Sequence, residues 1–202
     1  MQIEEAQWEM RWSFLGGFGG QLVSGLLWLI SAALASRIGP RPAILVLVLG
    51  GVGIFPLTQL AVRAMGRPGR VSPANALYGL GAQVAFVLPL SLPLVGAATL
   101  HRLDWFYPAF MIAVGAHYLP FVFLYGMRLY AVLCGILVTG GILLGTVLPA
   151  PFPAGGWLTG LLLLAFALAG RAAVRREEAT RAVPPVATRR AGSPSRATAG
   201  PS

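Results

Sequence analysis

The chain has 202 residues, of which 56% are hydrophobic and only 10% are charged, and its mean hydropathy is +0.75. A soluble domain usually carries about 25% charged residues, so this composition excludes a water-soluble globule and indicates a protein embedded in lipid. The formal net charge is +9, and every basic residue is arginine. These arginines flank apolar segments or lie in the C-terminal tail, so we expect them to orient the chain in a membrane and expect no nucleic-acid partner.

Residues that bind metals or form disulfides are scarce. Cys134 is the single cysteine, which excludes an internal disulfide framework and a cysteine-rich zinc site. His101 and His117 are the only histidines, so one chain has too few for an all-histidine metal site. We therefore expect no metal ion and no cofactor.

Residues 1–13 precede the first apolar run and carry Glu4, Glu5 and Glu9. A secretory signal peptide would carry positive charge at this place. We interpret the segment as a short cytoplasmic N-terminal segment and expect the first apolar run to be retained.

Six apolar segments follow, each close to the roughly 20 residues that a membrane helix needs. They cover residues 14–36, 42–62, 76–100, 105–125, 127–148 and 155–171. Lipid offers the backbone no hydrogen-bond partner, so such segments are helices, and they lack the alternating polarity of a membrane β-barrel. The sequence predicts an all-α, polytopic membrane helix bundle with six transmembrane helices over residues 14–171.

Glycine and proline are frequent inside these segments. The pairs Gly16–Gly20 and Gly141–Gly145 have the spacing of small residues that lets membrane helices approach closely, although a substrate crevice is an alternative. Pro89 and Pro93 lie one turn apart and predict a bend in the third helix.

The distribution of arginine predicts the orientation of the chain. With six spans, Arg37, Arg41 and Arg102 fall on one side of the membrane, and all other arginines fall on the side of the two termini. The positive-inside rule then places both termini in the cytoplasm, with the chain in the inner membrane of the cell. Membrane lipids are the expected partners, and a homo-oligomer stays open.

Residues 172–202 are rich in arginine, proline and alanine and contain no aromatic residue. Such a segment buries too little surface to offset its ordering entropy, so we expect a disordered cytoplasmic tail. On this interpretation a deletion of residues 176–202 leaves folding intact. Contact of the tail arginines with anionic lipid headgroups is the less favoured alternative.

Three stretches carry a resemblance to a known family. They are "FLGGFGGQLVSGLLWL" at 14–29, "IFPLTQL" at 54–60 and "WFYPAFMIAVGAHYLPFVFLYGMRLY" at 105–130. The chain resembles an uncharacterised family of multi-pass bacterial membrane proteins, a domain-of-unknown-function family, over most of residues 1–148. The resemblance implies membrane topology and no activity, substrate or catalytic residue.

Enzyme signatures are mostly missing from the sequence. It contains no P-loop, HExxH, GxSxG or paired-carboxylate motif, so we assign no catalytic residue and rank an intramembrane enzyme last. The loop "HRLDW" groups His101, Arg102 and Asp104 near the outer surface. With no third metal ligand at hand, we interpret this outer cluster as an interfacial ion-pair group.

Buried polar residues provide the candidate site. Counted from the predicted span ends, Gln21, Gln83, Cys134 and His117 lie about 10–12 Å deep from the cytoplasmic face, and Gln59 lies about 5 Å deep. An imidazole in hydrocarbon needs a partner, so we expect His117 to hydrogen-bond Gln21 or Gln83. Such a layer is either a polar lock between helices or a binding site for a proton or small solute. The two candidate functions are therefore a small transporter or channel-like protein and a non-catalytic scaffold or accessory subunit.

Overall fold

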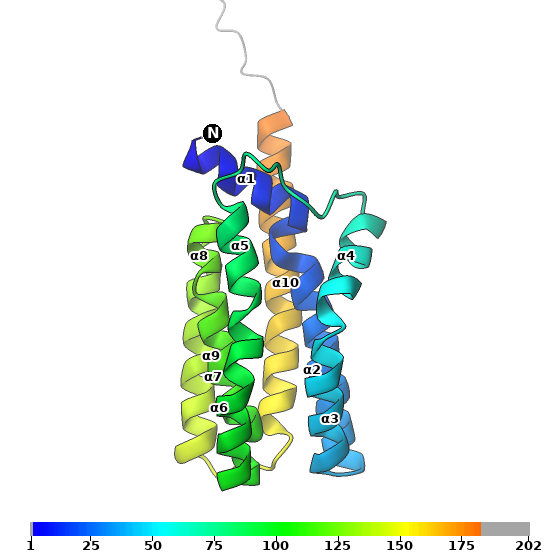
Figure 1. Cartoon of the computed structure of the whole chain (residues 1–202), viewed down its shortest axis with the longest axis vertical. Helices are drawn as coiled ribbons and strands as arrows, with labels where there is room; N and C mark the ends of the chain where they lie inside the picture. Colours follow the sequence, from blue (N-terminus) through cyan, green and yellow to red (C-terminus); the bar gives the residue numbers. More distant parts are fainter. Residues whose placement is uncertain (1, 183–202) are drawn as a thin grey trace, which may run out of the picture.

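The computed structural model describes residues 2–182, and every regular element in this range is a helix (Figure 1). The elements are α1 Ile3–Phe14, η1 Leu15–Gly17, α2 Phe18–Arg37, α3 Pro40–Gly51, α4 Ile54–Ala64, α5 Tyr78–Ala85, α6 Val87–His101, η2 Leu103–Trp105, α7 Phe106–Tyr118, α8 Phe121–Leu124, α9 Leu129–Thr146 and α10 Ala154–Ala182. The chain is a helical membrane bundle, as the sequence predicts.

Five helical segments are long and apolar enough to cross a membrane, and the pair α3 and α4 makes a sixth when it is counted as one span. This pair is bent by 61° at a short break, so the predicted second span is a broken helix. The break has a local cause, because Pro56 has no N–H to donate to the carbonyl of Val52, and glycine is dense just before it.

The third span is interrupted where α5 meets α6, and this interruption lies before the prolines, whereas α6 continues through Pro93. Helix α5 ends at Ala85 and α6 begins at Val87, with Phe86 between them. Pro89 is four residues after Ala85 and has no N–H to donate to the Ala85 carbonyl. The break therefore falls one turn before the first proline.

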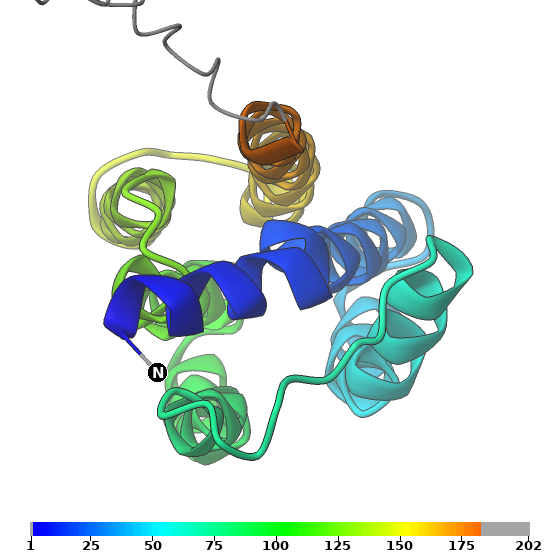
Figure 2. The same cartoon turned by 90° about the horizontal axis from the view of Figure 1, so that it is seen from above.

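The connections alternate between two ends of the bundle (Figure 1). At one end, which we call the α1 end, α1 lies across the bundle, together with the α4–α5 and α8–α9 connections (Figures 1 and 2). At the opposite end, the far end, lie the α2–α3, α6–α7 and α9–α10 connections. Residues 1–13 were predicted only as a segment, whereas the structure makes most of them a helix on the bundle's end.

Helices α2 and α10 pack closely because glycines face each other. A Cβ atom on Gly25 would meet the Gly160 carbonyl oxygen at 3.1 Å, and one on Gly160 would meet Leu29 Cδ2 at 2.6 Å. Gly141 of α9 lies equally close to α7, where a Cβ would meet the Pro108 carbonyl oxygen at 2.7 Å. These glycines let backbones approach as small residues do in membrane helix pairs.

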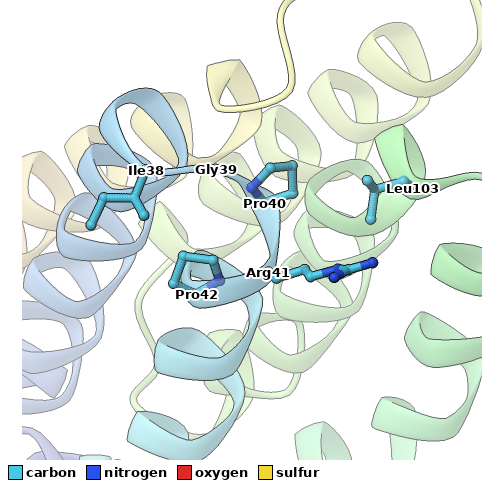
Figure 3. Close-up of a pocket in the computed structure, with 6 residues that line it drawn as sticks. All are labelled: Ile38, Gly39, Pro40, Arg41, Pro42 and Leu103. Atoms are coloured by element: carbon cyan, nitrogen blue, oxygen red, sulfur yellow. The ribbon is translucent and has the colours of Figure 1, made fainter.

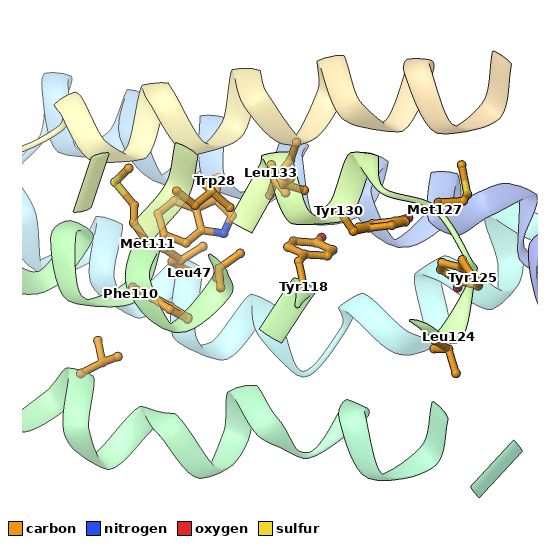
Figure 4. Packing of buried hydrophobic residues seen from close by; sticks show 14 of the residues in the cluster. Trp28, Leu47, Phe110, Met111, Tyr118, Leu124, Tyr125, Met127, Tyr130 and Leu133 are labelled. Atoms are coloured by element: carbon orange, nitrogen blue, oxygen red, sulfur yellow. The ribbon is translucent and has the colours of Figure 1, made fainter. Parts of the chain in front are cut away.

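The core of the bundle is apolar and rich in aromatic rings (Figure 4). Trp28 of α2 packs against Tyr107 and Phe110 of α7, with ring centroids 5.8 and 5.2 Å apart. Near the far end the buried Ser31 hydroxyl donates to the Ala43 carbonyl at 2.8 Å and lies 2.6 Å from the Tyr107 hydroxyl. These contacts join α2, α3 and α7, and they satisfy the buried hydroxyls of Ser31 and Tyr107.

Helix α10 continues past the predicted end of the last span. Residues 172–182 are helical, so the expectation of a disordered tail from residue 172 is wrong for this part. The reason is tertiary contact: Val174 is fully buried against Gly16, and Glu177 and Glu178 form ion pairs. The rest of the predicted tail, 183–202, lies outside the described residues.

Candidate functional site

The most unusual polar group of the bundle is the Gln21 side chain. Gln21 is 1% exposed, and its amide nitrogen and oxygen both lack a hydrogen-bond partner among the described residues. A buried donor or acceptor without a partner costs about 1–3 kcal/mol. Gln21 therefore provides a free NH2 donor group and a free acceptor oxygen inside the bundle.

Gln21 lies one turn below a sharp change of direction in the chain. Leu15, Gly16 and Gly17 all have left-handed backbone angles, with φ of 51°, 61° and 84°. Glycine is required at Gly17 because a Cβ there would lie 2.2 Å from the Tyr130 hydroxyl oxygen. This kink separates α1 from α2 and opens the first turn of α2 to side chains from α9.

Tyr130 stabilises the kink from the opposite side of the bundle. Its hydroxyl donates a hydrogen bond to the Gly16 carbonyl, which the left-handed turn leaves outside a regular helical ladder. Tyr130 is fully buried, so this contact fixes the depth of α9 relative to α2.

Aromatic rings surround Tyr130 (Figure 4). The Tyr118 ring stacks on it with centroids 5.7 Å apart, and Phe121 and Tyr125 lie at 5.4 and 5.6 Å. We call Tyr118, Phe121, Tyr125 and Tyr130 the aromatic cluster. Its phenols are neutral at ordinary pH, so the cluster adds hydroxyl groups without charge.

His117 lies at the edge of the aromatic cluster, half-buried on α7. Its ring makes edge contacts with Tyr118 and Phe121 at 5.4 and 5.2 Å and lies against the backbone of Val84 in α5. Its Nδ1 atom is buried without a partner among the described residues. The expected hydrogen bond from His117 to Gln21 or Gln83 is thus not formed, because the ring turns toward the α5 backbone.

The two other glutamines of the predicted layer lie apart from Gln21. Gln83 is exposed on α5, next to the Val84 that His117 contacts. Gln59 is half-buried on α4, where its Oε1 atom packs against Gly69 without a hydrogen-bond partner among residues 2–182. Cys134 is half-buried on α9, with its carbonyl facing Gly115. The structure brings His117 and Gln83 to neighbouring helices, but it joins no pair of these side chains.

The predicted outer cluster is not an ion-pair group. His101, Arg102 and Asp104 are all exposed, and no salt bridge links them in the described part of the chain. The helix breaks at Arg102, so His101 and Asp104 do not share one helical turn. Instead, His101 and Arg102 both lie against the Trp105 ring, at 5.6 and 5.4 Å. Across residues 2–182 there is also no group of three histidine, cysteine or acidic side chains suited to a metal.

Acidic residues that the sequence did not single out bind α1 to the bundle. Arg11 donates to both carboxylate oxygens of Glu177, at 3.0 and 2.9 Å, and also to the Tyr125 carbonyl. Arg67 pairs with Glu178 and lies over the Trp12 ring at 5.0 Å. The only sequence signal for these pairs was the adjacency of two acids in a tail otherwise rich in arginine.

A second set of hydrogen bonds holds α1 to the α4–α5 connection. Glu9 accepts from the Ser72 backbone at 2.7 Å and from Asn75 Nδ2 at 2.8 Å. The buried Asn75 also donates to the Ala6 carbonyl at 3.1 Å and accepts from the Leu77 backbone at 2.9 Å. Helix α1 is therefore attached on both sides and covers the end of the bundle nearest Gln21.

Two hollows open at the far end, and neither is lined by Gln21 or His117. One is formed by Ile38, Gly39, Pro40, Arg41, Pro42 and Leu103 (Figure 3). The other lies between the α6–α7 and α9–α10 connections, with Asp104 and Phe152 in its lining. Arg41 is exposed and is the one charged residue of an otherwise apolar lining in the first hollow.

Comparison with known proteins gives one match. Neither the curated proteins nor the solved structures contain a match to this chain. The model of a family of unknown function, DUF7010, matches residues 3–171, from α1 through most of α10. This range includes the kink, Gln21 and the aromatic cluster, and so the chain belongs to the DUF7010 family of unknown function.

Proposed function

We propose that the protein is a small transporter or channel-like protein that moves a small, uncharged polar solute through the layer around Gln21. The observation that supports this proposal is the buried Gln21 amide, whose donor and acceptor both lack partners among the described residues. A solute with one hydroxyl or amide group would satisfy both atoms. Because the bound solute would supply the missing hydrogen bonds, it would remove the free-energy cost of burying the unpaired Gln21 amide, and this favours the bound state.

The chemistry around Gln21 favours an uncharged solute over an ion. The kink one turn before Gln21 contacts Tyr130 of the aromatic cluster, which supplies the uncharged hydroxyls of Tyr118, Tyr125 and Tyr130. An ion would have to leave water without a counter-charge at this depth. A proton is the runner-up cargo, since the half-buried His117 carries an unpartnered Nδ1 at the edge of the same cluster.

The bent pair of helices α3 and α4 is the segment that we expect to move during transport. Transporters commonly build their sites from discontinuous helices, and α3 and α4 are bent by 61° beside α2. Thr58 and Val62 of α4 touch Gly19 of α2, two residues before Gln21. A change in this bend would reach the first turn of α2 directly.

The alternative is a non-catalytic scaffold or accessory subunit, in which the same features only pack helices. It is favoured by the close glycine contact of α2 with α10 at Gly25 and Gly160. It is also favoured by the position of the two hollows, which lie at the far end. On this alternative Gln21 is only a polar defect, and its removal should raise stability.

The test is solute flux in proteoliposomes. Stopped-flow light scattering with glycerol or urea gradients reports uncharged solutes, and entrapped pyranine reports protons. We expect glycerol or urea flux above that of empty liposomes, and we expect Gln21→Met, which keeps the side-chain length and removes the amide, to abolish it. Ser31→Ala is the matched control, because Ser31 is buried on the same helix with its hydrogen bonds satisfied.

The outcomes separate the two functions. Flux that persists in Gln21→Met rejects the site at Gln21. Absence of flux for all three probes, together with a higher unfolding temperature of Gln21→Met, supports the scaffold. Proton flux that is lost in His117→Leu and kept in Gln21→Met identifies the proton as the cargo.

The orientation of the chain is part of the proposal. The arginine distribution supports an orientation in which the α1 end and both termini face the cytoplasm and the bundle lies in the inner membrane. The exposed apolar side chains of α3 to α6 contact lipid in this arrangement, and a homo-oligomer that covers part of them is compatible with it.

A further inference from the structure

Arg171 of α10 stands out among the arginines of the α1 end. Its Nε atom is buried without a hydrogen-bond partner among the described residues, and its guanidinium lies over the Phe18 ring at 4.8 Å. The ion pairs of the described chain use Arg11, Arg67 and Arg181. Arg171 is therefore a partly desolvated cation for which residues 2–182 supply no carboxylate.

The position of Arg171 along α10 corresponds to the membrane surface. The helix begins at Ala154 at the far end, and the rise of an α-helix places Arg171 about 26 Å further along. The hydrocarbon core of a bilayer is about 30 Å thick. The guanidinium thus lies where hydrocarbon meets the phosphate groups of the lipids.

An apolar cluster lies directly below this guanidinium. Leu15, Phe18 and Ala167 are buried there, and the partly exposed Leu22 and Met65 pack against them. Ala167 is one helical turn from Arg171, so both lie on the same face of α10. The site has a cation at the membrane surface and an apolar patch inside the membrane. This arrangement matches a phospholipid, which has a charged phosphate headgroup and apolar acyl chains.

A second cation extends the site toward water. Arg175 is one further turn along the same face, is exposed, and takes no part in the ion pairs formed by Arg11, Arg67 and Arg181. The acid nearest along this face, Glu178, is engaged by Arg67. Positive charge on this face is therefore not compensated within the described chain.

We propose that Arg171 and Arg175 bind the phosphate of an anionic phospholipid, with an acyl chain lying against Leu22 and Met65. The planar guanidinium binds phosphate through two parallel hydrogen bonds, and Phe18 holds the Arg171 plane from one side. The proposal is independent of transport through the Gln21 layer, because it concerns the outside of α2 and α10.

The experiment is a titration of the purified full-length protein in mild detergent, read by native mass spectrometry and by thermal unfolding. The ligands are phosphatidylglycerol, phosphatidylcholine and inorganic phosphate. We expect phosphatidylglycerol to bind and to raise the unfolding temperature, while the other two give little shift. Arg171→Gln and Arg175→Gln should each weaken phosphatidylglycerol binding about fivefold, and Arg171→Lys should fall between Arg171→Gln and the wild type because it keeps only the charge.

Arg176→Gln is the matched control, since Arg176 is equally exposed on the same helix but on a different face. Phosphatidylglycerol affinity that is unchanged in both Arg171→Gln and Arg175→Gln overturns the proposal, as does an equal loss in Arg176→Gln. An equal shift with inorganic phosphate also overturns it, because the acyl chain would then take no part. If Arg171→Gln does not fold, Arg175→Gln decides alone, since its side chain makes no described contact that folding requires.

Discussion

Arg11 and Glu177 are 166 residues apart in the chain, and their side chains form an ion pair with two parallel hydrogen bonds at 3.0 and 2.9 Å. The Arg11 side chain is only 12% exposed, so the pair is partly shielded from water. Through it, the first helix of the chain is attached to the end of the last one. The pair closes the α1 end of the bundle above the kink that precedes Gln21.

Loss of this pair should weaken the protein measurably. We expect Glu177→Gln to lower the free energy of unfolding by about 1–2 kcal/mol, because it removes a charge-assisted bidentate contact from Arg11. Thermal unfolding in detergent measures the effect. Glu4→Gln is the control, since Glu4 is an exposed acid of α1 that makes no ion pair within residues 2–182. Equal unfolding temperatures for Glu177→Gln and the wild type would contradict the expectation.

Truncation tests the same attachment on a larger scale. A chain that ends before residue 176 loses both Glu177 and Glu178, so we expect lower yield and a lower unfolding temperature than for the full chain. This outcome is opposite to that expected from a disordered tail. A chain that ends after Ala182 keeps every contact of α10 described above and should unfold like the full chain. Equal unfolding temperatures for the two truncated chains would show that Glu177 and Glu178 do not stabilise the protein.

The kink at Gly17 should tolerate no side chain. In Gly17→Ala the new Cβ would lie 2.2 Å from the Tyr130 hydroxyl oxygen, at a φ of 84° that costs an L-residue roughly 1–2 kcal/mol. We expect a loss of more than about 2 kcal/mol in the free energy of unfolding. Gly20→Ala is the matched control, because its Cβ would meet nothing closer than 3.8 Å. Tyr130→Phe in the Gly17→Ala background should recover part of the loss, and no recovery would argue against the clash.

The hydrogen bond from Tyr130 to Gly16 can be tested separately. Tyr130→Phe keeps the ring and its stacking but leaves the Gly16 carbonyl without this donor, so we expect a cost of about 1 kcal/mol. Tyr78→Phe controls for the loss of a phenol, because Tyr78 is 59% exposed. An equal effect of the two substitutions in thermal unfolding would show that the buried hydrogen bond contributes nothing.

The orientation can be measured with reporter fusions. We expect fusions within residues 64–74 and after residue 182 to be cytoplasmic, and fusions at 38–41 and 150–154 to be external, because arginine is concentrated on the first side. A cytoplasmic signal from 38–41 would reverse the orientation and place the α1 end outside the cell.

The sequence by itself determined that this chain folds in a membrane and that its spans are helices. A membrane imposes a length of about 20 apolar residues and an internally bonded backbone on each span, so the apolar segments predicted the helices that are long enough to cross a membrane. The sequence did not predict helix α1. The depth of Gln21 and His117, which was counted from the rise of a helix, stays a prediction.

Only the tertiary structure decided what those residues contact. The direction of a side chain around its helix depends on which neighbours pack against it, so the ring of His117 lies against Val84 instead of either glutamine. Likewise, residues 172–182 are rich in the helix formers alanine, arginine and glutamate, but a short helix at the end of a chain is held in place by tertiary contacts, here with Arg11 and Arg67 from the other half of the chain. Ion pairs between residues so far apart in the chain leave no periodic pattern in the sequence. They form only when the whole bundle has assembled, and only then is the entropic cost of ordering residues 172–182 offset.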